Sequence, residues 1–169
     1  MAILNPQHLL EQAKTLVALY PKRKPRQVDL RRAISSAYYA VFHRIATAAA
    51  DEFVGVRLRR DSRYVLVYRG IEHGLIRQLC EEAAKSIPKP RYRKYLRKRE
   101  LSAGIKSFAN IFPSLQSKRH EADYDPSTTL TTIDALYAIH LAERAIAAFE
   151  SAPQEDRKLF LTFLLFPPR

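Results

Sequence analysis

Apolar residues recur along this chain at spacings of three and four, which is the period of an α-helix. The clearest example runs from about Arg26 to Ala50. A second apolar row beside the first makes more than half of this helix's circumference apolar, so it should lie at the centre of a bundle or between a core and a partner. The two rows are Leu30, Ile34, Ala37, Val41, Ile45 and Ala48, and Ser35, Tyr39, Phe42 and Ala46.

Capping signals and prolines divide the rest of the chain into further helices. Asn5-Pro6 and Asp125-Pro126 each place proline directly after a capping residue, which is typical of a helix start. Pro113 is expected to kink its helix or to mark a restart. The sequence predicts an all-α, up-and-down bundle of five to six helices in a single domain, 1–169. The predicted helices are 5–20, 26–50, 65–86, one from 101, 127–149 and a short C-terminal one at 154–166, with 52–64 as a loop.

The composition supports a folded core and excludes several classes of site. Hydrophobic residues make up 47% of the chain, which is enough for a packed interior. The four glycines are never closely paired, which excludes the dinucleotide fingerprint and the P-loop. The single cysteine, Cys80, excludes a disulfide framework and a zinc site built from cysteines. We therefore predict no cofactor and no metal.

The beginning of the chain and its apolar runs do not suggest export or membrane insertion. Residues 1–20 form an amphipathic pattern without the basic start and apolar block of a secretory signal. The longest apolar run, around 159–166, is far shorter than the roughly 20 residues that span a bilayer. We expect a protein of the reducing cytoplasm with no membrane partner.

Positive charge is concentrated in the first part of the chain. The net charge is +12, made of +16 over residues 1–120 and −4 over residues 121–169. Such an excess attracts polyanions, of which nucleic acid is the commonest. A basic insert at 85–99 holds eight basic residues with Tyr92 and Tyr95 among them. It is either a solvated linker or an RNA-binding segment that offers charge and stacking surfaces, with Arg91, Arg93, Lys94, Arg97 and Arg99 as the expected contacts.

Arg119 occupies the next position of an apolar stripe that runs from Leu101 to Leu115. A buried arginine needs an anion nearby, because an unpaired charge costs several kcal/mol. Asp123 is four residues further on and can lie on the same helical face. Two interpretations follow. Either the pair is structural and closes a helix end, or Arg119 binds a phosphate and Asp123 orients it.

The five histidines do not show a metal-binding pattern. No two of them have the spacing of ligands on one helix, and His120-Glu121 lacks the second histidine of a zinc protease. His43 ends the run Ser36-Ala-Tyr-Tyr-Ala-Val-Phe-His43 and is typical of a packed core histidine. No serine lies in a nucleophile elbow, which disfavours classical hydrolase chemistry.

Two segments together resemble the HEPN superfamily of small prokaryotic proteins. The run Arg32-Ala-Ile-Ser-Ser-Ala-Tyr-Tyr-Ala-Val-Phe-His43 is similar to that family's second-helix signature. The segment Arg119-His-Glu-Ala-Asp-Tyr124 is similar to its Arg-x-x-Ala-Asp-Tyr segment, which precedes a long C-terminal helix. The resemblance covers roughly residues 5–150; the basic insert and the last helix are less typical.

The resemblance implies a helical bundle that forms a homodimer, with the arginine segments facing each other across a shared cleft. Many members are metal-independent ribonucleases, and many are toxins controlled by a minimal nucleotidyltransferase. They use a histidine four to six residues after the arginine, but positions 124, 125 and 126 are Tyr, Asp and Pro. The site residues carried over are Arg119, Asp123 and Tyr124, and His120 or His43 would have to replace the missing histidine. Tyr39 is a further expected contact of the ligand.

Three hypotheses follow from the sequence. The first is an RNA- or nucleotide-binding HEPN protein, as one component of a toxin–antitoxin or defence system. The second is a metal-independent ribonuclease that uses a non-standard histidine. The third is a non-catalytic dimeric scaffold in which the Arg119–Asp123 pair only stabilises an interface.

Overall fold

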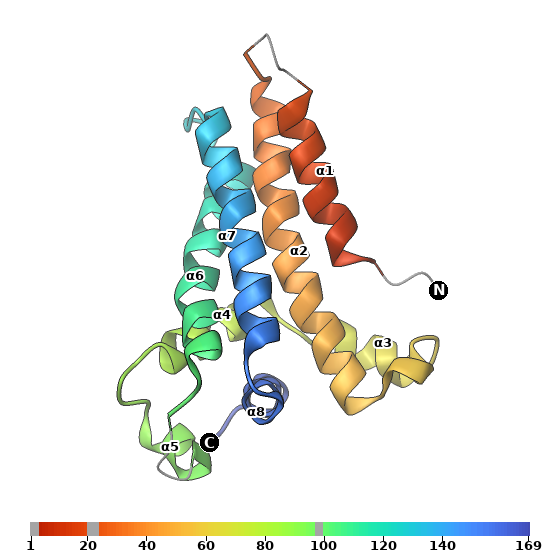
Figure 1. Cartoon of the computed structure of the whole chain (residues 1–169), viewed down its shortest axis with the longest axis vertical. Coiled ribbons are helices and arrows are strands. Elements are labelled where there is room, and N and C mark those ends of the chain that lie inside the picture. Colours follow the sequence, from red (N-terminus) through yellow and green to blue (C-terminus); the bar gives the residue numbers. More distant parts are fainter. Residues whose placement is uncertain (1–3, 20–23, 97–99) are drawn as a thin grey trace.

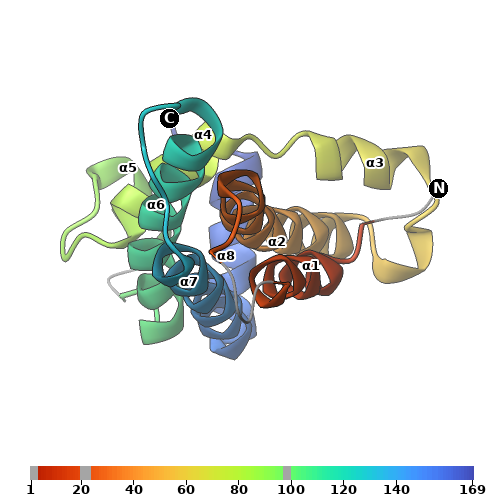
Figure 2. The ribbon, with the colours of Figure 1, turned by 90° about the horizontal axis from the view of Figure 1, so that it is seen from above.

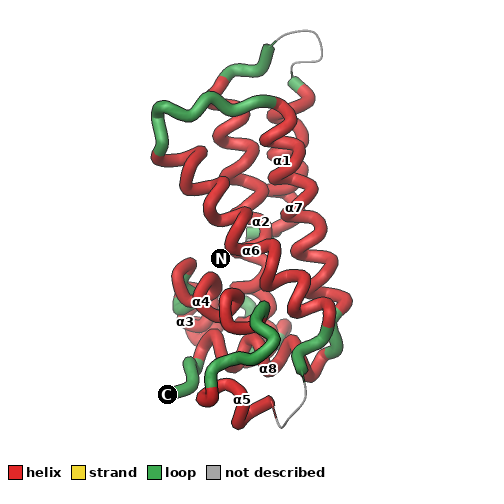
Figure 3. Tube along the Cα trace, turned by 90° about the vertical axis from the view of Figure 1, so that its left-hand side faces the viewer, coloured by secondary structure: helices red, strands yellow, loops and turns green. Residues whose placement is uncertain are grey.

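The computed structural model describes residues 4–19, 24–96 and 100–169, and every regular element in these ranges is helical (Figure 3). The all-α prediction is therefore confirmed. The described ranges contain eight α-helices and one short 3-10 helix, more than the five to six we expected. These are α1 (Pro6–Ala18), α2 (Gln27–Phe53), η1 (Val56–Leu58), α3 (Ser62–Arg69), α4 (His73–Ala83), α5 (Pro90–Leu96), α6 (Ala103–Tyr124), α7 (Thr132–Ser151) and α8 (Gln154–Leu165).

Four long helices form the body of the molecule. α1, α2, α6 and α7 run alternately up and down along the longest axis (Figure 1). The short helices α3, α4, α5 and α8 gather at the lower end in that view. Seen from above, α3 extends to one side of α2 while α5 lies on the opposite side (Figure 2).

α2 is the central helix of the bundle. It packs against α1, α7, α6 and α3, and its buried residues lie all around its axis. Many of them are alanines, which let neighbouring helices approach closely. The wide apolar arc of the 26–50 segment is thus covered by the chain itself, and it gives no argument for a partner.

The helix predicted for 65–86 is divided in two. α3 ends at Arg69, and the backbone N–H of Gly70 donates to the carbonyls of Leu66 and Val67. Ile71 is buried between the two helices, and α4 starts at His73. Glycine at a helix end is a common stop signal, so the break has a local cause that the apolar spacing alone does not show.

Several predicted boundaries also move. α2 continues to Phe53, and the predicted loop 52–64 also contains η1 and the start of α3. Asp125 organises a turn instead of starting a helix, because its carboxylate accepts from the Ser127 backbone. α7 begins later, at a capping box in which Thr131 and Asp134 bond reciprocally. Pro113 lies inside α6, which does not restart there.

The basic insert contains a helix of its own. α5 buries Tyr92 and Leu96 and exposes Arg91, Arg93 and Lys94, while Arg97 and Arg99 lie outside the described residues. The short C-terminal helix is found at Gln154–Leu165, close to its predicted bounds. No helix in the described part of the chain has the length and apolar character needed to cross a membrane.

Candidate functional site

Arg119 is held in the last two turns of α6, facing α2. Its Nη2 donates a 2.6 Å hydrogen bond to the Tyr39 hydroxyl. Its Nε is buried and lies 3.0 Å from Asp123 Oδ2, as an ion pair without the alignment of a hydrogen bond. The Ser35 hydroxyl donates to the other oxygen of Asp123. The predicted Arg119–Asp123 pair therefore exists, and α2 fixes both partners.

Three tyrosine rings surround the guanidinium of Arg119. The Arg119 Cζ lies 5.5 Å from the ring centre of Tyr38, 5.3 Å from that of Tyr39 and 5.4 Å from that of Tyr124. The Arg119 side chain is 14% exposed, whereas Tyr124 is 62% exposed. Three aromatic rings therefore surround the positive charge of Arg119, and the Tyr124 ring is exposed to solvent.

The environment keeps Arg119 charged. Burial on its own would lower the pKa of Arg119, but the hydrogen bond to Tyr39 and the negative charge of Asp123 outweigh it, so the pKa is raised. Among the described residues, no hydrogen-bond partner faces its second terminal nitrogen, Nη1. Arg119 therefore stays positively charged, and its Nη1 can still donate hydrogen bonds to a ligand.

Arg31 and Gln27, near the start of α2, hold the end of α6 in place. No sequence pattern singles out either residue. The Arg31 guanidinium donates to the carbonyl oxygens of Ala122, Asp125 and Thr128 at 2.6–2.9 Å. A cation suits the carbonyl end of a helix. The Gln27 side-chain amide bonds to both the N–H and the C=O of Leu130. These contacts hold the segment that carries Asp123 and Tyr124 against α2.

Two histidines lie beside the arginine. His43 Nδ1 is hydrogen bonded to the Tyr68 hydroxyl at 2.7 Å, and its ring stacks with Tyr39 at 6.0 Å between centroids. His73 Nδ1 is hydrogen bonded to the Tyr38 hydroxyl at 2.6 Å, and its ring stacks on Phe42 at 3.9 Å. Tyr38 and Tyr39, which both contact Arg119, therefore connect it to both histidines.

Both of these histidines favour the neutral form. Burial lowers the pKa of His43, and the nearby His73 lowers it further. Burial also lowers the pKa of His73, followed by the positive charge of Arg119. The sequence does not predict His73 as a site residue, because no sequence motif indicates that the first residue of α4 lies beside Tyr38 and Tyr39 of α2.

His120 occupies a different position from the other two histidines. It is exposed, and its ring lies 4.8 Å from the ring of Tyr124. The Tyr124 ring contacts both the His120 ring and the guanidinium of Arg119. In the part of the chain that the structure describes, His, Cys, Asp and Glu form no group of three able to hold a metal.

The basic insert lies far from Arg119. α5 is at the lower end of the molecule, near the start of α6, while Arg119 is near the upper end of the same helix (Figures 1 and 3). Twenty-two residues make α6 about 33 Å long. The predicted site residues that the structure describes thus form two groups: one of Arg119, His120, Asp123, Tyr124, Tyr39 and His43, and one of Arg91, Arg93 and Lys94.

The larger cavities lie apart from Arg119. One of about 480 Å³ is bounded by Lys85, Arg93, Lys94 and Lys106, and one of about 500 Å³ lies beside Arg44 and Arg59. Arg119 lines neither of these two cavities. The chain matches no protein-family model, no curated protein and no solved structure.

Proposed function

We propose that this protein binds RNA or a nucleotide through a phosphate at Arg119. One observation carries the proposal: the guanidinium is oriented by Tyr39 and Asp123, and its Nη1 has no partner among the described residues beside the exposed ring of Tyr124. Arginine donates well to phosphate oxygens. A neighbouring base can stack on an exposed tyrosine.

Charge and the two motifs support this proposal. The net charge of +12 favours a polyanionic partner. The segments at 32–43 and 119–124, whose resemblance is to HEPN proteins, supply Ser35, Tyr39, Arg119 and Asp123, and these side chains meet in space. An HEPN-type protein that works within a toxin–antitoxin or defence system fits this arrangement.

Binding to single-stranded RNA is expected to weaken steeply as salt rises, because phosphate contacts release counterions. Titrating a fluorescent RNA at several salt concentrations measures the slope of affinity against salt. Replacing Arg91, Arg93 and Lys94 by serine should lower the affinity and flatten that slope if a strand reaches from Arg119 to α5. An unchanged slope would make the basic insert a solvated segment, and no binding by the parent protein would remove the proposed function.

A metal-independent ribonuclease is the second candidate function, and the two neutral histidines favour it. A neutral His43 or His73 could take the proton of an RNA 2′-hydroxyl. The 2′-oxygen would then bond to the adjacent phosphorus, the bond to the next ribose would break, and the departing oxygen would take up a proton. Arg119 would stabilise the charge of the phosphorane. RNA cleavage in EDTA, lost in a His43→Asn or a His73→Asn variant, is the test.

We also propose that the chain forms a homodimer and pairs with a minimal nucleotidyltransferase. α7 exposes Ile133, Leu136 and Tyr137, with Ile133 at 77% exposure. Apolar residues gathered on one helix face are typical of interaction surfaces. Light scattering is expected to report twice the mass of one chain, and an Ile133→Lys variant should report a single chain. A monomeric parent at tens of micromolar would contradict the dimer.

A further inference from the structure

A second polar cluster lies on another face of α2, beyond the Arg119 site. Arg44, Thr47 and Asp51 follow one another at spacings of three and four, so they lie on one side of the helix. The Arg44 Nε donates to Glu150 Oε1 on α7 at 2.6 Å. Asp51 accepts two hydrogen bonds from Arg59, of 3.0 and 2.7 Å, and one of 2.8 Å from the buried Tyr64.

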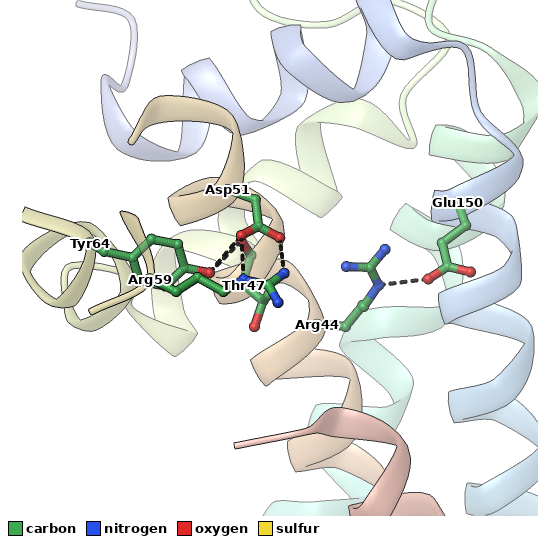
Figure 4. A network of polar contacts seen from close by, with 6 residues as sticks. All are labelled: Arg44, Thr47, Asp51, Arg59, Tyr64 and Glu150. Atoms are coloured by element: carbon green, nitrogen blue, oxygen red, sulfur yellow. Dashed lines mark hydrogen bonds and ion pairs between the residues drawn. The ribbon is translucent and has the colours of Figure 1, made fainter. Parts of the chain in front are cut away.

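The local backbone brings Arg59 back to α2. Gly55 follows the end of α2 with a φ of 102°, a conformation that side chains disfavour. The chain then reverses through η1, and Arg59 meets Asp51 eight residues before it. Figure 4 shows the Arg44 guanidinium between Glu150 and Arg59, and the Arg59 guanidinium bound to Asp51.

A pocket of about 500 Å³ lies between these two arginines. Its wall also includes the N-cap and first two residues of α1 (5–7), together with Thr47, Ile146 and Glu150. Pockets of this volume hold small molecules. The start of α1 adds the positive end of its dipole, although Asn5 already caps the Gln7 amide.

The pocket wall offers more donors than acceptors. Both terminal nitrogens of Arg44, and Nη1 of Arg59, have no hydrogen-bond partner among the described residues. Thr47 is only 7% exposed, and its hydroxyl is buried with no partner in the described structure. A buried hydroxyl without a partner is costly, and the free terminal nitrogens of the two guanidiniums can still donate to an anion. An anion between them would satisfy all three groups.

We propose that this pocket binds a small phosphate monoester, with the phosphate between Arg44 and Arg59 and with Thr47 donating to it. A carboxylate is planar and pairs with one guanidinium edge. The tetrahedral phosphate offers oxygens in several directions and so matches donors that arrive from opposite sides. Ile146 and Pro6 supply an apolar surface for the body of the ligand.

Calorimetric titration with inorganic phosphate, phenyl phosphate and acetate tests the site. We expect saturable binding of both phosphates, tighter for phenyl phosphate, and none of acetate. Arg44→Gln and Thr47→Val should each weaken phosphate binding about tenfold. Thr47→Ser should retain it. Arg63→Gln is the matched control, because Arg63 pairs with Asp61 nearby but does not line the pocket.

Melting temperatures of all variants show whether the fold persists, and Thr47→Val still decides the question if Arg44→Gln does not fold. The proposal would be overturned if the parent bound neither phosphate, or if both pocket variants bound phosphate as tightly as the parent. Arg119→Ala should bind phosphate here normally, which separates this site from the proposed RNA site. If Arg44→Gln lost RNA affinity while the parent bound no small phosphate, the pocket would be an RNA contact and the proposal would fail.

Discussion

Replacing Arg119 by alanine is expected to lower RNA affinity about 10–100-fold. The reason is the loss of a charge-assisted hydrogen bond to phosphate, worth about 1.5–3 kcal/mol. The variant should still fold, because Asp123 keeps its contact with Ser35 and its side chain is 27% exposed. We expect the free energy of unfolding to fall by about 1–2 kcal/mol, which for a chain of this size lowers the melting temperature by about 2–8 °C.

Arg77→Ala is the matched control for Arg119→Ala. Arg77 also pairs with an acid four residues on, Glu81, but its side chain is 43% exposed on α4. Its replacement should leave RNA affinity within about twofold and stability nearly unchanged. A double-mutant cycle with Asp123→Ala separates the two interpretations of the pair. A large loss of stability at Arg119 with unchanged RNA affinity would identify it as structural.

Gly104→Ala is expected to be the most destabilising of the small substitutions. A Cβ on Gly104 would lie 2.6 Å from the Ala148 carbonyl oxygen and 3.0 Å from the Ala152 Cβ, both at the end of α7. Neither can move without shifting the backbone of α7. We expect the free energy of unfolding to fall by about 2–3 kcal/mol, a decrease of about 5–10 °C in melting temperature.

Gly74→Ala supplies the comparison for Gly104→Ala. Gly74 lies near the start of α4, and a Cβ there would meet nothing within 4 Å. Alanine has the better helix propensity, so this variant should gain about 0.5 kcal/mol. Thermal melts of the two variants compare the same chemical change in two environments. Equal melting temperatures would contradict the close approach of α6 and α7.

The long helices could be predicted from the sequence because each has a continuous apolar stripe that ends at a strong signal. The 26–50 segment was placed within a few residues of α2 for this reason. The apolar spacing continues across Gly70 and Ile71 and so does not predict the break between α3 and α4, which the backbone hydrogen bonds of Gly70 show. The start of α7 was misplaced because the Asp125-Pro126 pair imitates a helix start, whereas Thr131 and Asp134 form the true cap.

The core of the candidate site could be predicted, and its surroundings could not. Helical spacing alone places Asp123 beside Arg119, and the ion pair confirms it. The contacts of Arg119 with Tyr39 and of Arg31 with the end of α6 join positions some 80 to 90 residues apart. Such contacts depend on how α2 and α6 pack, which local periodicity does not encode. His73 joins the site for the same reason, through Tyr38.

Photo-crosslinking of a thiouridine-substituted RNA oligonucleotide tests most directly whether RNA lies at the Arg119 site. Peptides that carry a crosslink can be identified by mass spectrometry after digestion. RNA held at this site should crosslink to Tyr124 and to the α2 peptide that contains Tyr39, and Arg119→Ala should abolish both crosslinks. Crosslinks confined to α5, unchanged by Arg119→Ala, would contradict the proposed function.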